Sequence, residues 1–163
     1  MIRPATSVDA AWITDLWNAV IDGSLITFTT VPKTQAGIAE LITTRPVFVL
    51  SDQGGFATYG PFRDGPGYSA TVEHTVMLAP HAQGQGQGRA LMTYLMDHGR
   101  EAGKHIMVAG ISGANPGAVA FHERLGFQQV GHMPEVGRKA QQWLDLIMMQ
   151  KHLNPPDSAA HTR

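Results

Sequence analysis

Three glycines at alternate positions, within residues 83–89, constrain this 163-residue chain more than any other feature. The run reads Gln-Gly-Gln-Gly-Gln-Gly-Arg and lies between a β-type segment, residues 68–78, and an apolar helical segment that begins near Ala90. Glycine adopts positive φ and lets the backbone approach a ligand closely, so successive N–H groups can converge just before a helix N-terminus. Such a point favours a pyrophosphate group. The alternative is a glycine-rich surface turn.

Two common nucleotide-binding loops do not fit this run. A P-loop requires Gly-Lys-Ser or Gly-Lys-Thr, and a dinucleotide-binding turn requires G-x-G-x-x-G, whereas this run reads G-x-G-x-G followed by Arg89. The pattern that fits is Gln/Arg-x-x-Gly-x-Gly/Ala, carried by Gln83, Gly86 and Gly88. This pattern resembles the acetyl-CoA loop of the GNAT superfamily of N-acetyltransferases.

Further stretches resemble one branch of that superfamily, the phosphinothricin or methionine sulfoximine acetyltransferase-like enzymes. They run in the family's order, and the resemblance covers about residues 1–152. It implies an α/β GNAT fold with a mixed central sheet splayed open at its long fourth strand, helices on both faces, and acyl-CoA in the V-shaped gap. The matching residues are Thr71-Val72-Glu73-His74-Thr75-Val76, Ala109-Gly110-Ile111 with Asn115, Phe121-His122-Glu123-Arg124-Leu125-Gly126-Phe127, and Trp143-Leu144-Asp145-Leu146 with Met149-Gln150.

The order of predicted elements agrees with a mixed α/β sheet. Apolar residues at Ile13, Trp17 and Ile21 recur with helical spacing and predict a first helix that ends near Gly23. Later periodicities and turn signals predict further elements along the chain. These are helices at 34–44, 90–102 and 118–125, and strands at 47–51, 56–60, 68–78, 106–111, 127–133 and 142–150.

Length and composition are those of one domain. A chain of 163 residues with 43% hydrophobic content can bury one core, so we expect a single domain over residues 1–153 and a flexible tail at 154–163. The net charge of -1, without a Lys/Arg run, argues against nucleic acid or an anionic membrane as partner. The sequence has no cysteine, its first residues lack the apolar stretch typical of a signal peptide, and it contains no apolar run of membrane-spanning length. We therefore expect a cytoplasmic protein.

Glu73 is the candidate general base. An amine acceptor is mostly protonated at neutral pH, so a group must remove its proton before it attacks a thioester. Strand alternation places Glu73 on the opposite side from Val72, His74 and Val76, where it can face the gap. The resemblance implies a catalytic glutamate at this position, acting directly or through a water. The alternative is a glutamate on a solvated strand face.

The acyl donor is expected to be held mainly by backbone. The strand at Val76, Met77 and Leu78 would pair with the pantetheine amides and supply N–H groups to the thioester oxygen. The side chains there are otherwise ordinary core residues. Asn115 matches the asparagine that bonds the pantetheine arm, or it is simply a helix-start residue. The resemblance assigns the pyrophosphate to Gln83, Gly84, Gln85, Gly86, Gln87, Gly88 and Arg89.

His122 is the second candidate catalytic residue. The departing coenzyme A thiolate benefits from a proton donor, and His122 stands where the broader superfamily commonly has a tyrosine. The resemblance implies a general acid or a partner of Glu73, and packing against the cofactor is the alternative. The other histidines lack metal-binding spacing, so acetyl-CoA is the expected cofactor and no metal is expected.

The acceptor is expected to be a small amino-acid-like amine of the phosphinothricin, methionine sulfoximine or methionine sulfone type. The resemblance places Thr27, Phe28, Thr71 and Glu73 in its pocket, puts Trp143 and Lys139 near that pocket or a dimer contact, and implies a homodimer. Three positions depart from relatives: Ser69 and Gln142 replace arginines suited to a carboxylate, and Ala118 replaces a serine by the cofactor. A less acidic amine therefore competes as acceptor.

Two other classes stay open. A non-catalytic acyl-CoA sensor could share the fold, although Glu73 and His122 argue for an enzyme. A protein lysine or N-terminal acetyltransferase needs an open peptide groove. The apolar loop at residues 25–28 favours a closed small-molecule pocket instead.

Overall fold

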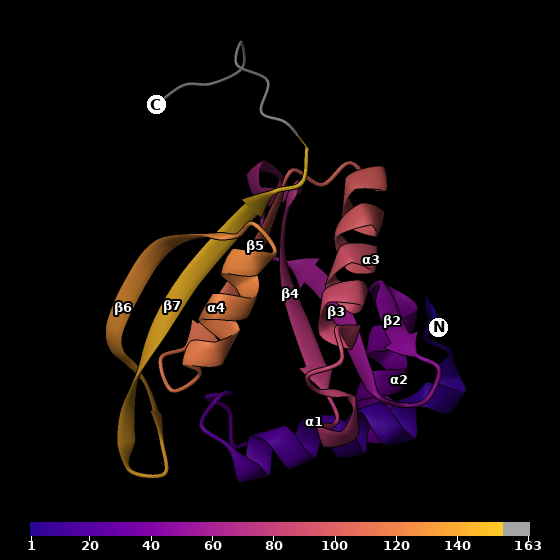
Figure 1. Ribbon diagram of the computed structural model, residues 1–163, viewed down its shortest axis with the longest axis horizontal. Helices are drawn as coiled ribbons and strands as arrows, with labels where there is room; N and C mark the ends of the chain where they lie inside the picture. Colours follow the sequence, from indigo (N-terminus) through magenta and orange to yellow (C-terminus); the bar gives the residue numbers. More distant parts are fainter. Residues whose placement is uncertain (155–163) are drawn as a thin grey trace.

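A seven-stranded mixed sheet forms the centre of the computed structural model, which describes residues 1–154 (Figure 1). The strand order is β1-β2-β3-β4-β5-β7-β6, and β4 and β5 pair in parallel while the other neighbours are antiparallel. This confirms the predicted α/β GNAT-type architecture. The strands are β1 (Ile2–Pro4), β2 (Val47–Leu50), β3 (Gly55–Pro61), β4 (Thr71–Leu78), β5 (Ile106–Ser112), β6 (Gln128–Lys139) and β7 (Gln142–His152).

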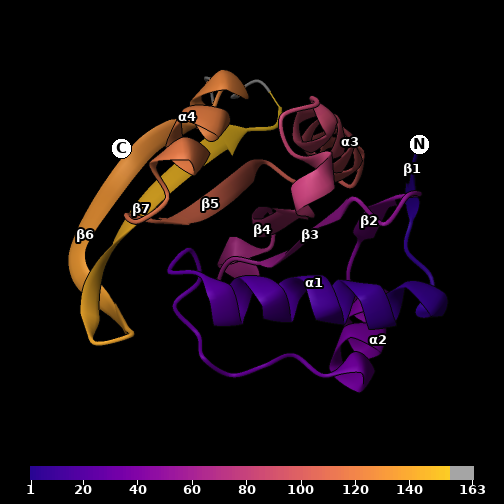
Figure 2. The same ribbon diagram turned by 60° about the horizontal axis from the view of Figure 1, so that its bottom comes forward.

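Helices cover both faces of this sheet. Figure 2 shows α1 (Ala10–Gly23) and α2 (Gln35–Thr44) below the sheet, and α3 (Gln87–Glu101) and α4 (Pro116–Arg124) above it. The buried apolar residues accordingly divide into two clusters, one with α1 and α2 and one with α3. Strand β4 contributes to both clusters, because Val72 faces the α3 side and Met77 faces the α1 side.

The sheet splits between β4 and β5. Their parallel pairing runs only from Thr71, opposite Ile106, to Glu73, opposite Val108. Beyond that point β5 stays paired with β7 as far as Ser112, whereas β4 stays paired with β3 as far as Leu78. The two strands diverge, and every second residue in the second half of β4 points its backbone N–H and C=O groups toward the gap, since the others bond to β3.

Several element bounds differ from those predicted. The short strand β1 was missed, since a three-residue strand has little periodicity. Strand β4 begins at Thr71 rather than residue 68, because residues 66–68 form a 3-10 turn that starts at a proline. Strand β6 extends to Lys139, passing through an irregular stretch between Met133 and Gly137 that includes Glu135 with φ 56°. Of the predicted tail, only Asn154 lies within the described residues. No helix in residues 1–154 has the length and apolarity needed to cross a membrane.

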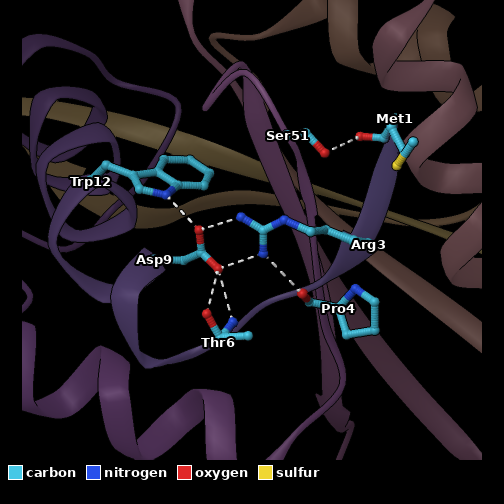
Figure 3. Close-up of polar contacts among 7 residues, drawn as sticks. All are labelled: Met1, Arg3, Pro4, Thr6, Asp9, Trp12 and Ser51. Carbon is cyan, nitrogen blue, oxygen red and sulfur yellow. Dashed lines mark hydrogen bonds and ion pairs between the residues drawn. The ribbon is translucent and has the colours of Figure 1, made fainter.

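Asp9 ties β1 to the start of α1 (Figure 3). Its carboxylate is 3% exposed and accepts two hydrogen bonds from Arg3, at 2.8 and 2.9 Å. It also accepts from the Thr6 backbone N–H at 2.8 Å and from Trp12 Nε1 at 3.0 Å. The bonds from Arg3 hold the pKa of Asp9 far below its ordinary value. This end of the molecule is therefore fixed by a satisfied buried charge.

Candidate active site in the split between two strands

A cavity of about 390 Å³ occupies the split. Residues 74–77 of β4 and 109–112 of β5 form its two walls. Helix α4 and the loop after α1 complete it with Asn115, Ala118, Phe121, His122 and residues 26–29. The cavity thus lies in the gap between β4 and β5, beside the candidate residues His122 and Asn115.

The glycine loop forms a turn at the N-terminus of α3 whose backbone N–H groups are free within residues 1–154. Gly84 and Gly86 have φ of 73° and 76°, and a Cβ at either position would meet nothing within 4 Å, so backbone conformation is what requires glycine. Ala90 is the first residue of α3 whose N–H bonds backwards, to Gly86 O at 3.1 Å. In the described chain the N–H groups of residues 84–89 have no backbone acceptor. Such a cluster suits the pyrophosphate of a coenzyme A thioester.

The remaining residues of the run hold this turn in place. A Cβ at Gly88 would lie 3.1 Å from Leu78 Cδ1 and 3.5 Å from Phe121, so glycine here permits close packing. Gln83 Nε2 donates to Leu78 O at 3.4 Å, and Gln85 Nε2 donates to His81 O at 2.7 Å. Residues 83–89 follow β4 and do not line the cavity themselves, nor does Leu78.

Asn115 fits both interpretations made from the sequence. Its Oδ1 accepts from Ala118 N at 3.3 Å, which caps α4. It also lines the cavity together with Val76 and Met77. The amide group of Asn115 keeps its two N–H donors beside the cavity, where a pantetheine carbonyl can accept.

Glu73 stands at the point where the two strands part. It is the last β4 residue paired with β5, and its Oε1 lies 3.2 Å from where a Cβ of Gly110 would be. Gly110 lines the cavity but Glu73 itself does not, so the carboxylate lies beside the cavity wall at a residue that has no side chain. Desolvation raises the pKa of Glu73. A carboxylate with a raised pKa is a better proton acceptor at neutral pH.

His122 bonds to a second histidine rather than to Glu73. Its Nδ1 lies 2.7 Å from Ala118 O, a carbonyl that can only accept, so Nδ1 carries the proton. Its Nε2 lies 3.0 Å from Nε2 of His74, and the two rings stack with centroids 5.0 Å apart. Burial lowers the pKa of His122, and burial together with His122 lowers that of His74 to about 3.

These contacts fix the protonation pattern of the neutral pair. Because His122 Nε2 is bare, the proton between the rings belongs to His74 Nε2. His74 Nδ1 is then a bare acceptor, and it is buried without a hydrogen-bond partner. Both ring nitrogens of His122 are consequently used within the protein.

The acceptor side is closed by the loop that follows α1. Phe28 packs over Gly137, where a Cβ would lie 2.5 Å from the ring. Lys139 Nζ, on a side chain 8% exposed, donates to Ile21 O at 2.6 Å and to Thr27 O at 2.9 Å. Thr27 and Phe28, both predicted to bind the acceptor, line the cavity. Thr71 does not, since it lies at the opposite end of β4 beside a separate cavity.

The three positions that depart from relatives lie in different surroundings. Ser69 borders the same separate cavity as Thr71. Gln142 is exposed at the turn between β6 and β7, opposite Lys139. Only Ala118 lines the cavity in the split.

Sequence reasoning missed several residues of the cavity wall, among them Trp17, Lys33, His74 and Ser112. Alternation pointed away from His74, since it placed His74 on the face opposite Glu73, the residue expected to face the gap; the cavity is lined by His74 instead. No pattern in the sequence pointed to Ser112. Its place in the site depends on a contact between distant segments, since Ser112 Oγ donates to Leu25 O at 2.8 Å across 87 residues of sequence. Within residues 1–154 no three His, Cys, Asp or Glu side chains gather in a way that could hold a metal ion.

Comparisons with known proteins agree with this geometry. Residues 29–127 match the model of the Acetyltransferase (GNAT) family. The L-methionine sulfoximine/L-methionine sulfone acetyltransferase of Salmonella typhimurium is 39% identical over 94% of both chains. The phosphinothricin N-acetyltransferase of Streptomyces coelicolor is 33% identical over 93% of this chain and 95% of its own. An acetyltransferase from Salmonella typhimurium, solved with acetyl-CoA, superimposes with a TM-score of 0.90 at 34% identity, covering 97% of this chain and 98% of its own. The chain therefore belongs to the GNAT family of acetyltransferases.

Proposed function

We propose that this protein transfers the acetyl group of acetyl-CoA to the amine of a small amino-acid-like acceptor of the methionine sulfoximine, methionine sulfone or phosphinothricin type. The observation that carries the proposal is the cavity in the β4–β5 split, together with the glycine turn that follows β4 and Glu73 at the point where the two strands part. The names of the similar enzymes support the acceptor class.

Glu73 acts as the base in this reaction. It takes a proton from the acceptor amine, directly or through a water, as the nitrogen bonds to the acetyl carbon. The C–S bond then breaks and the sulfur takes up a proton. Because the pKa of Glu73 is raised, it differs less from the pKa of the acceptor amine, which favours the proton transfer.

Backbone groups hold the donor. Backbone groups of β4 at Val76 and Leu78, which point away from β3, supply hydrogen bonds to the pantetheine arm and to the thioester oxygen as it gains negative charge, whereas the N–H of Met77 points to β3. The N–H groups of residues 84–89 hold the pyrophosphate. Arg89 is exposed in the first turn of α3, where a cation adds to this anion site.

His122 reaches the departing thiolate only if its bond to His74 opens. In the closed pair the Nδ1 proton is bound to Ala118 O and Nε2 has no proton to give. With the pair closed, His122 acts by packing against the thioester. With it open and His122 protonated, Nε2–H can donate to sulfur.

The protein is also proposed to be a cytoplasmic homodimer. The absence of cysteine fits a reducing compartment. Large apolar side chains stand exposed on β6 and β7, among them Trp143 at 59%. A surface of this kind suits a protein contact. Sedimentation of the wild type and of Trp143→Ser tests the dimer, which the variant is expected to weaken.

The test of the function is thiol release from acetyl-CoA with a panel of amines. The panel contains methionine sulfone, methionine sulfoximine, phosphinothricin, a lysine-containing peptide and an uncharged amine. Thiol release with the first three above the peptide supports the proposal. Release with the peptide alone points to a protein acetyltransferase, and binding of acetyl-CoA without any release points to a sensor.

A further inference from the structure

Lys33 is the one formally charged side chain among the described residues that line the cavity. It lies between α1 and α2, after the loop that closes the acceptor side. The remaining lining is apolar or neutral, and both histidines there have lowered pKa values. A single cation in a mostly apolar wall is positioned to act on whatever the cavity binds.

The backbone of Lys33 is held at both of its polar groups. Asn18 Oδ1 accepts from Lys33 N at 2.7 Å, and Asn18 Nδ2 donates to Lys33 O at 3.0 Å. One side chain on α1 therefore fixes the position of this loop residue. Such clamping lowers the entropy cost of placing a long side chain at a defined point.

The ammonium group of Lys33 is also held, but not by an acid. Nζ lies 4.7 Å from the centroid of the Trp17 ring, a cation–π contact against a residue that is 9% exposed. Within residues 1–154 no carboxylate oxygen lies within 4.0 Å of Nζ. The half-buried cation keeps its hydrogen-bond donors for a group that comes from outside the chain.

We infer that Lys33 is the specificity residue that binds an anionic oxygen group of the acceptor. This inference rests on the proposed function and names the acceptor class, an amino acid that carries a free acidic group. Lys33 lines the cavity and Glu73 lies next to Gly110 of its wall, so a zwitterionic acceptor would meet a charge of opposite sign at its amine and at its acid. Lys33 thereby supplies the positive charge that Ser69 and Gln142 do not.

The test compares acceptors with and without the acidic group in matched variants. Thiol release is measured with L-methionine sulfone and with its α-amide, for wild type, Lys33→Met and Lys33→Arg. Lys33→Met should raise the KM for methionine sulfone by about 10- to 100-fold and leave kcat nearly unchanged, since a hydrogen bond to a charged group is lost. The KM for the amide should change by less than about twofold, and Lys33→Arg should retain most of the preference.

Controls separate this inference from the proposed function. Lys104→Met removes a lysine whose Nζ donates to Ser69 O, away from the cavity, and should leave both KM values unchanged. Equal changes for the two acceptors, or no change for either, overturn the role of Lys33 while leaving acetyl transfer intact. Phosphinothricin and its α-amide show whether the α-carboxylate or the side-chain acid is the partner.

A wild-type protein that transfers to no amine overturns the proposed function instead. Calorimetric titration with methionine sulfone then decides the inference without activity. Binding that is about tenfold weaker in Lys33→Met supports the role of Lys33. Equal affinity in the two proteins, or no binding to the wild type, overturns it.

Discussion

The two sides of the β4–β5 split are built by different means. On the donor side, a short run of glycines and one strand edge present backbone N–H groups, all within residues 76–89. On the acceptor side, the loop after α1 is held by contacts that cross 87 residues, from Ser112 to Leu25, and 112 residues, from Lys139 to Thr27. A backbone site depends on local conformation, whereas a side-chain site depends on the tertiary fold.

This difference predicts that the two sides can be damaged separately, and the largest effect is expected at Gly86. Gly86→Val places a β-branched residue at φ 76° in the turn that faces the pyrophosphate. The rise in Tm caused by acetyl-CoA, which follows RT ln(1 + [L]/Kd), should disappear. Thermal melts with and without acetyl-CoA measure it.

Gly103→Val is the matched control. Gly103 has φ 77°, and like Gly86 its Cβ would meet nothing within 4 Å. Both variants should lose about 1 to 2 kcal/mol of folding free energy from left-handed strain. Only Gly103→Val should keep the full acetyl-CoA shift. If acetyl-CoA raised the Tm of both variants by the same amount, the glycine loop would not be the donor-binding site.

On the acceptor side, Gly137→Ala is expected to give the next largest effect. A Cβ there would lie 2.5 Å from Phe28 Cδ2, so the ring must move. The acceptor KM should rise by about tenfold, on the usual scale for a displaced contact in a packed site, while the Kd of acetyl-CoA stays within about twofold. Initial-rate kinetics and donor titration check this. Gly131→Ala, on the same strand with its nearest contact at 3.7 Å, should behave as wild type.

Much of the fold and of the donor side could be predicted from sequence because those signals are local. The glycine run stands directly before helix α3, and the motif with Glu73 falls on a strand, β4. The acceptor side could not be read in the same way. Thr71 was predicted to line the pocket from its place in the motif, yet β4 carries it to the far end of the strand. Lys33 and Ser112 reach the cavity only through folding contacts that no spacing encodes.

The pair formed by His74 and His122 lies between the donor and acceptor sides. Changes to this pair are expected to have a smaller effect, mainly on stability. His74→Leu leaves His122 Nε2 as a buried acceptor without a donor and should cost about 1 to 3 kcal/mol of stability. His74→Gln retains an N–H donor and should recover part of that loss. Side-chain ¹⁵N NMR should show His122 protonated at Nδ1 and mostly neutral at pH 6.5, its ordinary pKa. A His122 protonated only at Nε2 would contradict this hydrogen-bond assignment.

The same pair predicts a pH dependence of stability. Both imidazoles have pKa values lowered by burial, so the unfolded chain binds more protons below pH 6.5. The wild type should lose stability as pH falls below 6.5, the ordinary histidine value. His74→Leu should lose less over the same range. Denaturant titrations at several pH values measure the difference, and parallel curves for the two proteins would contradict it.

The most direct test of the account is the pH dependence of Glu73→Gln, because Glu73 stands where the donor and acceptor sides meet. Glutamine keeps size and hydrogen bonding but cannot take the amine proton. Turnover at neutral pH should fall by about 10²-fold or more while acetyl-CoA affinity stays nearly constant, and exposed Glu123→Gln should match wild type. The deficit should shrink as pH rises toward about 9, where more acceptor amine is already neutral. Wild-type turnover at neutral pH, or a deficit that stays constant with pH, would contradict the assignment of Glu73 as the base.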